Sequence, residues 1–252
     1  MSAGHILSTF NNHITTIEFY HPAQNSMPGH LLSELVRHIY TAGADDNTYV
    51  IILKSAGERT YCAGASFTEL AAIPDSQTGK TFFMGFANVI LAIKNCPKII
   101  IGRVHGKAVG GGVGLAAACD YTMATQYASV RLSELAVGIG PFVIGPAVER
   151  KIGLSAFSQM SLNANEWQTA AWAKSKGLFT EVFDTTIQLD AYIEHFTTDL
   201  VLKNPEALMA LKKIFWEGTD HWGELLETRA EVSGKLILSD FAKKAIGAFL
   251  NE

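Results

Sequence analysis

The chain has 252 residues, of which 48% are hydrophobic and only 17% charged, with 20 Lys and Arg against 24 Asp and Glu for a formal net charge of -4. A chain of this length and apolar composition can bury a large core, which excludes an intrinsically disordered protein, and its slight acidic excess argues against nucleic acid or an anionic membrane as partner. Its charged fraction lies below the roughly 25% typical of soluble domains, so we expect either subunits that cover one another or a site for an apolar ligand.

The first part of the chain is predicted to form a strand, a helix and a second strand. Residues 14–19 (ITTIEF) predict a first strand, and the turn-rich segment 21–29 follows it with two prolines and a glycine. Apolar residues then recur at helical spacing over 31–40, with Gly43 placed to end the helix. Residues 49–53 (YVIIL) predict a buried strand, and this β-α-β order is typical of α/β proteins.

Helices and strands continue to alternate in the middle of the chain. We expect a short helix that begins at Phe67 and stops before Pro74, and a longer helix over 81–95. A strand is predicted over 98–104. Three glycines at 110–112 then begin a segment of small residues. This pattern predicts a helix whose first N–H groups are not covered by side chains.

After the glycine segment the pattern passes from strands to helices. Residues 121–124 and 129–132 predict two strands on either side of a turn. Residues 133–146 contain two prolines and three glycines without clear periodicity, and predict a loop or broken helix that lines a site. From Ala147 onward the pattern is mostly helical.

The expected organisation is a core over residues 1–190 and a C-terminal helical region over 191–252, because the chain changes character near residue 190. No uncharged apolar run reaches the roughly 18 residues that a membrane span needs, and the N-terminal residues lack the pattern of a leader peptide. The cysteines form no CxxC pair, so neither a zinc ribbon nor a disulfide framework is indicated, and we expect a cytoplasmic protein. They are Cys62, Cys96 and Cys119.

The glycine-rich turns do not match the common nucleotide or nucleophile motifs. A GxGxxG that starts at Gly110 would need a glycine where Leu115 stands, and no glycine spacing matches a P-loop. Gly64-Ala65-Ser66 lacks the second glycine of a nucleophile elbow. Both turns lead into helix starts, where unpaired N–H groups can meet an anion or a carbonyl oxygen. The alternative role of such glycines is to let helices and strands pack closely.

Four segments, taken in order, resemble the crotonase (enoyl-CoA hydratase/isomerase) family. They are HPAQNSM at 21–27, YCAGASFTEL at 61–70, VHGKAVGGGVGLAAACDYTMA at 104–124 and SELAVGIGP at 133–141. Residues 153–182 also look like the linking helices of that family, so the resemblance spans nearly the whole chain. It implies an α/β fold with a spiral of ββα units, a C-terminal helical region that forms a homotrimer or a dimer of trimers, and an acyl-CoA thioester as substrate. It implies no metal or redox cofactor, since coenzyme A is part of the substrate.

The resemblance also implies which residues form the site. By the family pattern, the backbone N–H groups of Ala65 and Gly111 form an oxyanion hole around the thioester oxygen, and Ala63 lies near the adenine end of coenzyme A. Removing a proton next to a thioester places charge on that oxygen, so fixed donors stabilise the enolate more than the ground state. The further substrate contacts that it implies are Gly64, Ser66, Phe67, Gly110 and Phe142, together with C-terminal positions Lys243, Lys244 and Phe249. Ser66 stands where the family usually has Asp.

The carboxylates distinguish this chain from typical hydratases of the family, which use two glutamates. Gly114 occupies the position of the first glutamate, just after the third glycine, whereas Glu134 keeps the second. Apolar residues at 132, 135 and 137 predict surroundings that raise the pKa of Glu134. We expect Glu134 to be the catalytic base; the alternative is a solvated glutamate near a helix start.

A single glutamate favours isomerisation over hydration. A 1,3 shift of a double bond needs one base that removes a proton and returns it two carbons away, whereas hydration must also position a water molecule. Phe142 replaces a small residue beside the expected acyl pocket, where its ring would exclude water. The sequence therefore favours an isomerase of 3-enoyl-CoA to 2-enoyl-CoA. A hydratase with one glutamate, another crotonase-type enzyme such as a hydrolase or decarboxylase, and a non-catalytic acyl-CoA-binding protein remain as alternatives.

Overall fold

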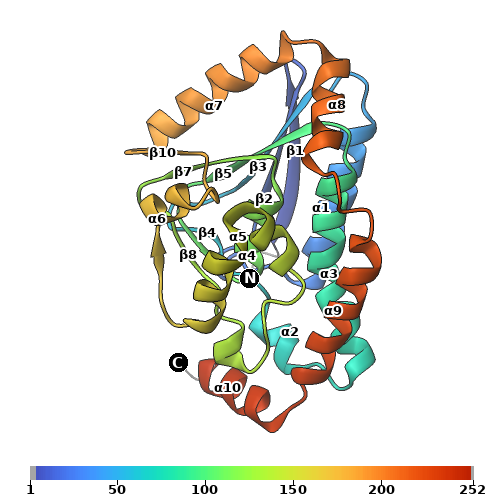
Figure 1. Ribbon diagram of the computed structural model, residues 1–252, viewed down its shortest axis with the longest axis vertical. Coiled ribbons are helices and arrows are strands. Elements are labelled where there is room, and N and C mark those ends of the chain that lie inside the picture. Colours follow the sequence, from blue (N-terminus) through green and yellow to red (C-terminus); the bar gives the residue numbers. More distant parts are fainter. Residues whose placement is uncertain (1–3, 251–252) are drawn as a thin grey trace.

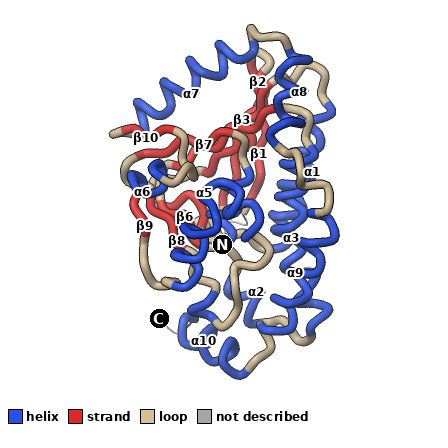
Figure 2. The backbone as a smooth tube through the Cα atoms, in the orientation of Figure 1, coloured by secondary structure: helices blue, strands red, loops and turns tan. Residues whose placement is uncertain are grey.

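A computed structural model describes residues 4–250 of the chain, which form two sheets enclosed by helices (Figure 1, Figure 2). Residues 1–3 and 251–252, at the ends of the two expected domain ranges, lie outside the described residues. The larger sheet has the strand order β1-β2-β3-β5-β7-β10 and is parallel except for the antiparallel pair β1 and β2. Its strands are β1 His5–Asn11, β2 Ile14–Tyr20, β3 Val50–Ser55, β5 Ile99–Val104, β7 Tyr121–Thr125 and β10 Glu181–Phe183.

The smaller sheet has the order β4-β6-β8-β9, with β9 antiparallel to its neighbour. Consecutive strands alternate between the two sheets, since β3, β5 and β7 belong to the larger sheet and β4, β6 and β8 to the smaller one. Helices return the chain between these pairs, and the result is the spiral of ββα units that the resemblance implied. The strands of the smaller sheet are β4 Thr60–Cys62, β6 Lys107–Val109, β8 Ser129–Arg131 and β9 Gln168–Thr169.

Ten helices and one 3-10 turn complete the described part of the chain. Several begin at a side-chain cap: Asp75 accepts from the Thr78 amide at 2.8 Å, and Thr185 with Gln188 forms a capping box. The helices are α1 Gly29–Ala44, α2 Phe67–Ala71, α3 Ser76–Asn95, α4 Gly111–Ala118, α5 Gly145–Leu162, α6 Ala170–Ser175, α7 Thr186–Val201, α8 Pro205–Phe215, α9 Trp222–Leu236 and α10 Asp240–Leu250, and the 3-10 turn is Leu135–Val137.

Most predicted elements are present, with differences at their ends. The strand predicted as the first is β2, because β1 precedes it and pairs with it along its full length. The helix predicted over 81–95 begins earlier, at Ser76, because Asp75 caps it. Gly43 lies inside α1 rather than after it. Residue 190, the expected boundary between core and helical region, lies within α7.

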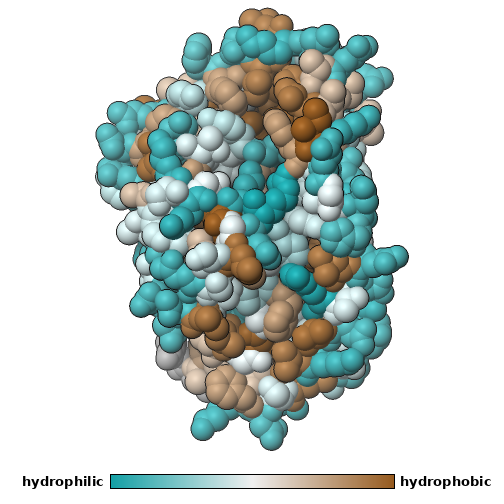
Figure 3. Space-filling model, viewed as in Figure 1, coloured by the Kyte–Doolittle hydropathy of each residue, from teal (hydrophilic) through white to brown (hydrophobic). Residues whose placement is uncertain are grey.

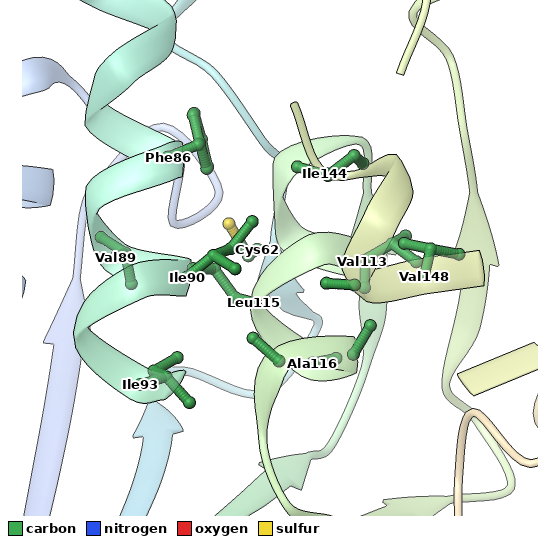
Figure 4. Packing of buried hydrophobic residues seen from close by; sticks show 14 of the residues in the cluster. Cys62, Phe86, Val89, Ile90, Ile93, Val113, Leu115, Ala116, Ile144 and Val148 are labelled. Carbon is green, nitrogen blue, oxygen red and sulfur yellow. The ribbon is translucent and has the colours of Figure 1, made fainter. Parts of the chain in front are cut away.

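Helix α4 is buried along its whole length, and this burial positions the candidate site. It consists of glycine, alanine and a few aliphatic residues, which let neighbouring elements approach it from several sides. Figure 4 shows Phe86 and Ile90 of α3 on one side of α4, and Ile144 and Val148 on the other. The N-terminus of α4 therefore lies inside the molecule.

A buried ion pair joins the C-terminal helices to this core. The Asp120 carboxylate, just beyond α4, accepts from Lys212 Nζ at 2.6 Å, Trp216 Nε1 at 2.9 Å and the Ile100 amide at 2.8 Å. Both charged side chains are buried, so loss of either partner would leave an uncompensated charge in the interior. The pair thereby links α8 to β5. None of the helices described in the structure is both long and apolar enough to cross a membrane.

Candidate active site

A narrow cavity of about 60 Å³ lies where α2, α3, α4 and α9 meet the loop after β8. Most of its wall is apolar. The residues predicted for the site come from separate segments of the sequence, and the fold brings eight of them to this cavity. Those that line it are Ala63, Gly64, Ala65, Phe67, Gly110, Gly111, Glu134 and Phe142.

The turn between β4 and α2 lies so close to the start of α4 that the two backbones are in contact. Gly64 has a φ of +87°, and a methyl group on it would lie 2.8 Å from the Val109 carbonyl oxygen and 3.5 Å from the Gly111 nitrogen. Glycine is therefore required both by the positive φ and by the close approach. The 21–27 segment holds this turn, since the Ala63 amide donates to the Gln24 carbonyl at 3.1 Å and the Gly64 carbonyl accepts from the Met27 amide at 2.8 Å.

The second turn places Gly111 at the first position of α4. Gly110 has a φ of +51°, and its amide donates to the Arg131 carbonyl at 2.9 Å, which joins this turn to the end of β8. Within residues 4–250, neither the Ala65 amide nor the Gly111 amide has a hydrogen-bond acceptor. The Gly111 amide also belongs to the positive end of a helix. Two backbone donors from different turns are thus available at one cavity.

Glu134 immediately precedes the 3-10 turn, and its carboxylate is enclosed. A methyl group on Gly110 would lie 2.9 Å from Glu134 Oε1, which places the carboxylate directly beside the second turn. Its Oε2 is buried and has no hydrogen-bond partner in the described structure. Burial raises the pKa of Glu134 from 4.5 to about 7. The carboxylate can therefore exchange a proton near neutral pH.

The apolar surroundings of Glu134 differ in part from those predicted. Leu132 is buried and Val137 lines the cavity, but the Leu135 side chain is 46% exposed because the 3-10 turn directs it to solvent. The remaining apolar wall comes from further along the loop, at Ile139 and Val143. The prediction of an apolar environment was correct, and the prediction that Leu135 contributes to it was wrong.

Phe142 forms part of the cavity wall and is held by a contact with the C-terminal helices. The Phe142 amide donates to the Gly140 carbonyl at 2.7 Å, so the loop turns tightly at this point. Arg229 of α9 donates from Nη1 to the Phe142 carbonyl oxygen at 3.2 Å. The backbone at Phe142 is therefore anchored to α9.

No space is left at Gly114 for a second carboxylate. A methyl group on Gly114 would lie 2.5 Å from Ile144 Cγ2 and 2.7 Å from Ile144 Cβ. The Ile144 side chain thus packs against Gly114, the position at which the resemblance places the first glutamate of typical hydratases. Figure 4 shows Ile144 beside α4. The absence of that glutamate is accompanied by an apolar side chain that fills its place.

The predicted contacts Lys243, Lys244 and Phe249 do not line the cavity, and neither does Ser66. Its hydroxyl accepts from the Glu69 amide at 3.3 Å and caps α2. A serine just before a helix performs this role commonly, and the cap explains the residue without a substrate. At the mouth of the site, the Phe249 ring of α10 stacks on Phe67 with 4.0 Å between ring centroids.

Several cavity residues were not predicted from the sequence. Phe83 and Phe86 lie one helical turn apart on α3, so helical spacing could have identified them as one face. Ser133 directly precedes Glu134 and shares its position in the loop. Ser233 comes from α9, and no local sequence pattern connects it with a site about a hundred residues earlier.

The structure offers no metal site in the residues that it describes: no three His, Cys, Asp or Glu side chains cluster there. The three cysteines are free and buried. Burial raises the pKa of the Cys62 thiol to about 12, so this residue beside the first turn is a neutral packing group.

Comparison with known proteins identifies the family of the chain. The family described as enoyl-CoA hydratase/isomerase matches residues 9–252. A probable enoyl-CoA hydratase of Bacillus subtilis (strain 168) is 24% identical over 241 residues, which cover 95% of this chain and 93% of the relative. The 2,3-dehydroadipyl-CoA hydratase of Escherichia coli (strain K12) is 29% identical over 192 residues, or 76% and 73% of the two chains.

The fold is that of a solved enoyl-CoA hydratase. The crystal structure of the enzyme from Bacillus halodurans superposes with a TM-score of 0.89 over 96% of this chain and 99% of that one, at 21% identity. Family match and fold lead to the same conclusion. The chain belongs to the enoyl-CoA hydratase/isomerase family, the crotonase family of thioester enzymes.

Proposed function

We propose that this protein moves the double bond of an enoyl-CoA ester from position 3 to position 2, with Glu134 as the single acid and base. The observation that carries the proposal is the composition of the cavity wall. Among the described residues, Glu134 is the only ionisable side chain that lines it, and the Ile144 side chain fills the space beside Gly114. A reaction that needs one proton carrier fits this wall better than one that needs two.

In the proposed reaction Glu134 first takes a proton from C2 of the 3-enoyl thioester. The electron pair of that C–H bond delocalises onto the thioester oxygen and gives a dienolate. Glu134 then returns the proton to C4, the electrons of the former C3–C4 double bond form the new bond to hydrogen, and the double bond lies between C2 and C3. No atom is gained or lost, so neither water nor a cofactor enters the balance.

The amides of Ala65 and Gly111 are proposed to hold the charge on the thioester oxygen. Both residues line the cavity, and neither amide is used by another acceptor within residues 4–250. Donors of this kind are already oriented before the reaction, and removal of one typically costs about 3 kcal/mol of transition-state stabilisation. The enclosed site strengthens their effect because little water competes for the oxygen.

Hydration of a 2-enoyl-CoA by a single glutamate is the second candidate. It is favoured by the names of the relatives, which include a probable enoyl-CoA hydratase and a 2,3-dehydroadipyl-CoA hydratase. In this chain the water would have to be held without a second carboxylate. The hydroxyl groups of Ser133 and Ser233, which also line the cavity, are the groups available for that role.

Turnover of paired substrates by the purified protein tests the proposal. We expect a 3-enoyl-CoA to be converted to the conjugated 2-enoyl-CoA, followed by ultraviolet absorbance, and a 2-enoyl-CoA to give little 3-hydroxyacyl-CoA. Glu134→Gln should lower kcat by about 10²- to 10⁴-fold because it removes the proton carrier.

The pH dependence of turnover provides a further test. Since the base acts when ionised, kcat/KM should rise with pH and level off above about pH 7, where burial has placed the pKa of Glu134.

Glu58→Gln is the matched control, because Glu58 is exposed on the loop before the first turn, and it should leave turnover unchanged. Rapid formation of 3-hydroxyacyl-CoA from the 2-enoyl ester would replace the isomerase proposal with the hydratase. Release of free coenzyme A or of CO₂ would instead identify a hydrolase or a decarboxylase. Binding of the esters without turnover would contradict both candidates.

A further inference from the structure

The wall of the cavity has a chemical character that bears on the acyl group. Apart from backbone and small residues, it consists of aromatic and aliphatic side chains, among them Phe83, Phe86, Phe142 and Ile144. Within the part of the chain that the structure describes, no Lys, Arg or His side chain lines it. A pocket with this wall favours hydrocarbon and offers an anion no counter-charge.

Two arginines belong to segments that contact the wall of the cavity, Arg229 through the Phe142 carbonyl and Arg131 through the Gly110 amide. Arg229 contacts the loop through the Phe142 carbonyl oxygen and is not among the residues that line the cavity. The Arg131 guanidinium lies 4.6 Å from the Trp167 ring, and its Nε is buried without a hydrogen-bond partner in the described structure. Neither arginine is among the residues that line the cavity.

The polar side chains in the wall also give little support to an anion. The Ser233 hydroxyl donates to the Arg229 carbonyl at 3.2 Å, so its proton is already used and only its lone pairs are available. Ser133 could supply one donor. The third polar group is Glu134, which becomes an anion when it acts as the base. A second carboxylate in this space would be repelled by the ionised Glu134. It would also lose its hydrating water without gaining a counter-charge.

We propose that the site accepts an uncharged hydrocarbon acyl chain and discriminates against acyl-CoA esters that carry a second carboxylate. This inference rests on the proposed function, since it assigns the substrate class of the same site. It follows from the absence of a cation among the described lining residues together with the presence of Glu134 there. The aromatic rings of α3 and the 140–144 loop then act as the specificity-determining surface.

A matched pair of substrates tests this preference. The esters are 3-hexenoyl-CoA and the mono-thioester 3-hexenedioyl-CoA, which have the same chain except for a terminal carboxylate. We expect kcat/KM to be at least about 100-fold higher for 3-hexenoyl-CoA, because the carboxylate must enter an apolar wall without a partner. The methyl ester of the hexenedioyl compound keeps its length but removes the charge, and it should recover most of the loss. Equal or faster turnover of 3-hexenedioyl-CoA would overturn the inference.

Failure of the proposed chemistry can be told apart from failure of this inference. If neither ester is isomerised, calorimetric binding of the saturated hexanoyl-CoA and adipyl-CoA still measures the preference. Tighter binding of hexanoyl-CoA supports the inference even where the reaction is another one, and tighter binding of adipyl-CoA overturns it.

A substitution in the wall provides an independent test. Phe142→Arg places a cation in the cavity and should shift the ratio of kcat/KM toward 3-hexenedioyl-CoA by at least about tenfold, whereas Phe142→Leu should keep the preference of the original chain. The thermal unfolding of both variants shows whether they are folded. An unchanged ratio in a folded Phe142→Arg variant would mean that charge in the wall does not set the selectivity and would overturn the inference.

Discussion

Burial of the Glu134 side chain has opposite consequences for stability and for chemistry. Its Oε2 is buried without a partner, and burial raises its pKa to about 7. A carboxyl group with this pKa is a better acid and base at neutral pH than one at 4.5. The same burial penalises the ionised form in the folded state, so the residue that serves the reaction destabilises the protein above neutral pH.

Glu134→Gln should therefore stabilise the protein at high pH. Because the folded-state pKa is raised, the contribution of Glu134 to the free energy of unfolding is fully present below pH 4.5 and is lost as the pH rises to about 7. The loss amounts to at most about 3 kcal/mol. We expect the variant to match the original chain near pH 4.5 and to exceed it at pH 8 by about 1–3 kcal/mol in urea unfolding. Glu58→Gln should show no such pH-dependent difference, and a Glu134→Gln variant that is less stable at pH 8 would contradict the explanation.

At the scale of elements, the contact between α3 and α9 determines how the C-terminal helices reach the site. A methyl group on Gly79 of α3 would lie 2.8 Å from Gly234 Cα, so the two helices touch through backbone. One residue before Gly234 on α9, Ser233 lines the cavity, and one turn earlier Arg229 holds the Phe142 carbonyl. A shift of α9 would move both of these groups at once.

Gly234→Ala should disturb the site from outside it. A methyl group at this position would lie 2.5 Å from the Lys80 nitrogen and 2.8 Å from the Ser76 carbonyl oxygen, so α9 must move away from α3. We expect a loss of about 1–3 kcal/mol of stability and a lower kcat/KM, measured by thermal unfolding and turnover.

Gly223→Ala is the control for this substitution, because it lies on the same helix with no atom within 4 Å of the added methyl group. It should be neutral or stabilising by up to about 1 kcal/mol, since alanine favours a helix. Equal effects of the two substitutions would show that helix propensity, and not the contact with α3, determines the outcome.

The long elements were predictable from the sequence because each carries its own pattern. The helical spacing of apolar residues predicts α1, and the continuous apolar run predicts β3, each from its own few residues. The short strands β4, β6, β9 and β10 were missed, since two or three residues have no periodicity and are stabilised by pairing with distant partners. In the site, the two turns and Glu134 could be predicted from the resemblance. Ser233 could not, because only tertiary packing brings α9 to the cavity.

At the scale of the whole molecule, apolar side chains remain exposed around a second cavity of about 500 Å³ between α7, α8 and the larger sheet. Leu211 and Phe215 of α8 line it and are 43% and 44% exposed. Figure 3 shows an apolar surface over this part of the molecule. Exposed apolar surface of this kind commonly marks a protein interface. We therefore expect this face to be a contact between subunits in the homotrimer or dimer of trimers that the resemblance implies.

Sedimentation should thus detect a species that is a multiple of the single chain. Substituting Leu211→Glu and Phe215→Glu together should dissociate it, because two charges would have to be buried without partners. Leu7→Glu introduces the same change at an exposed leucine on β1, away from this cavity, and should leave the assembly intact. A monomeric original chain, or a double variant with unchanged mass, would contradict the assignment of this face.

The contact between Ile144 and Gly114 couples the side chains that these two positions can carry. A glutamate at 114 would recreate the pair of acids found in typical members of the family, but any side chain there collides with Ile144. Trimming Ile144 first would leave a void and provide no new chemistry. We therefore expect either substitution alone to lower stability, and the two together to cost less than the sum of their separate effects.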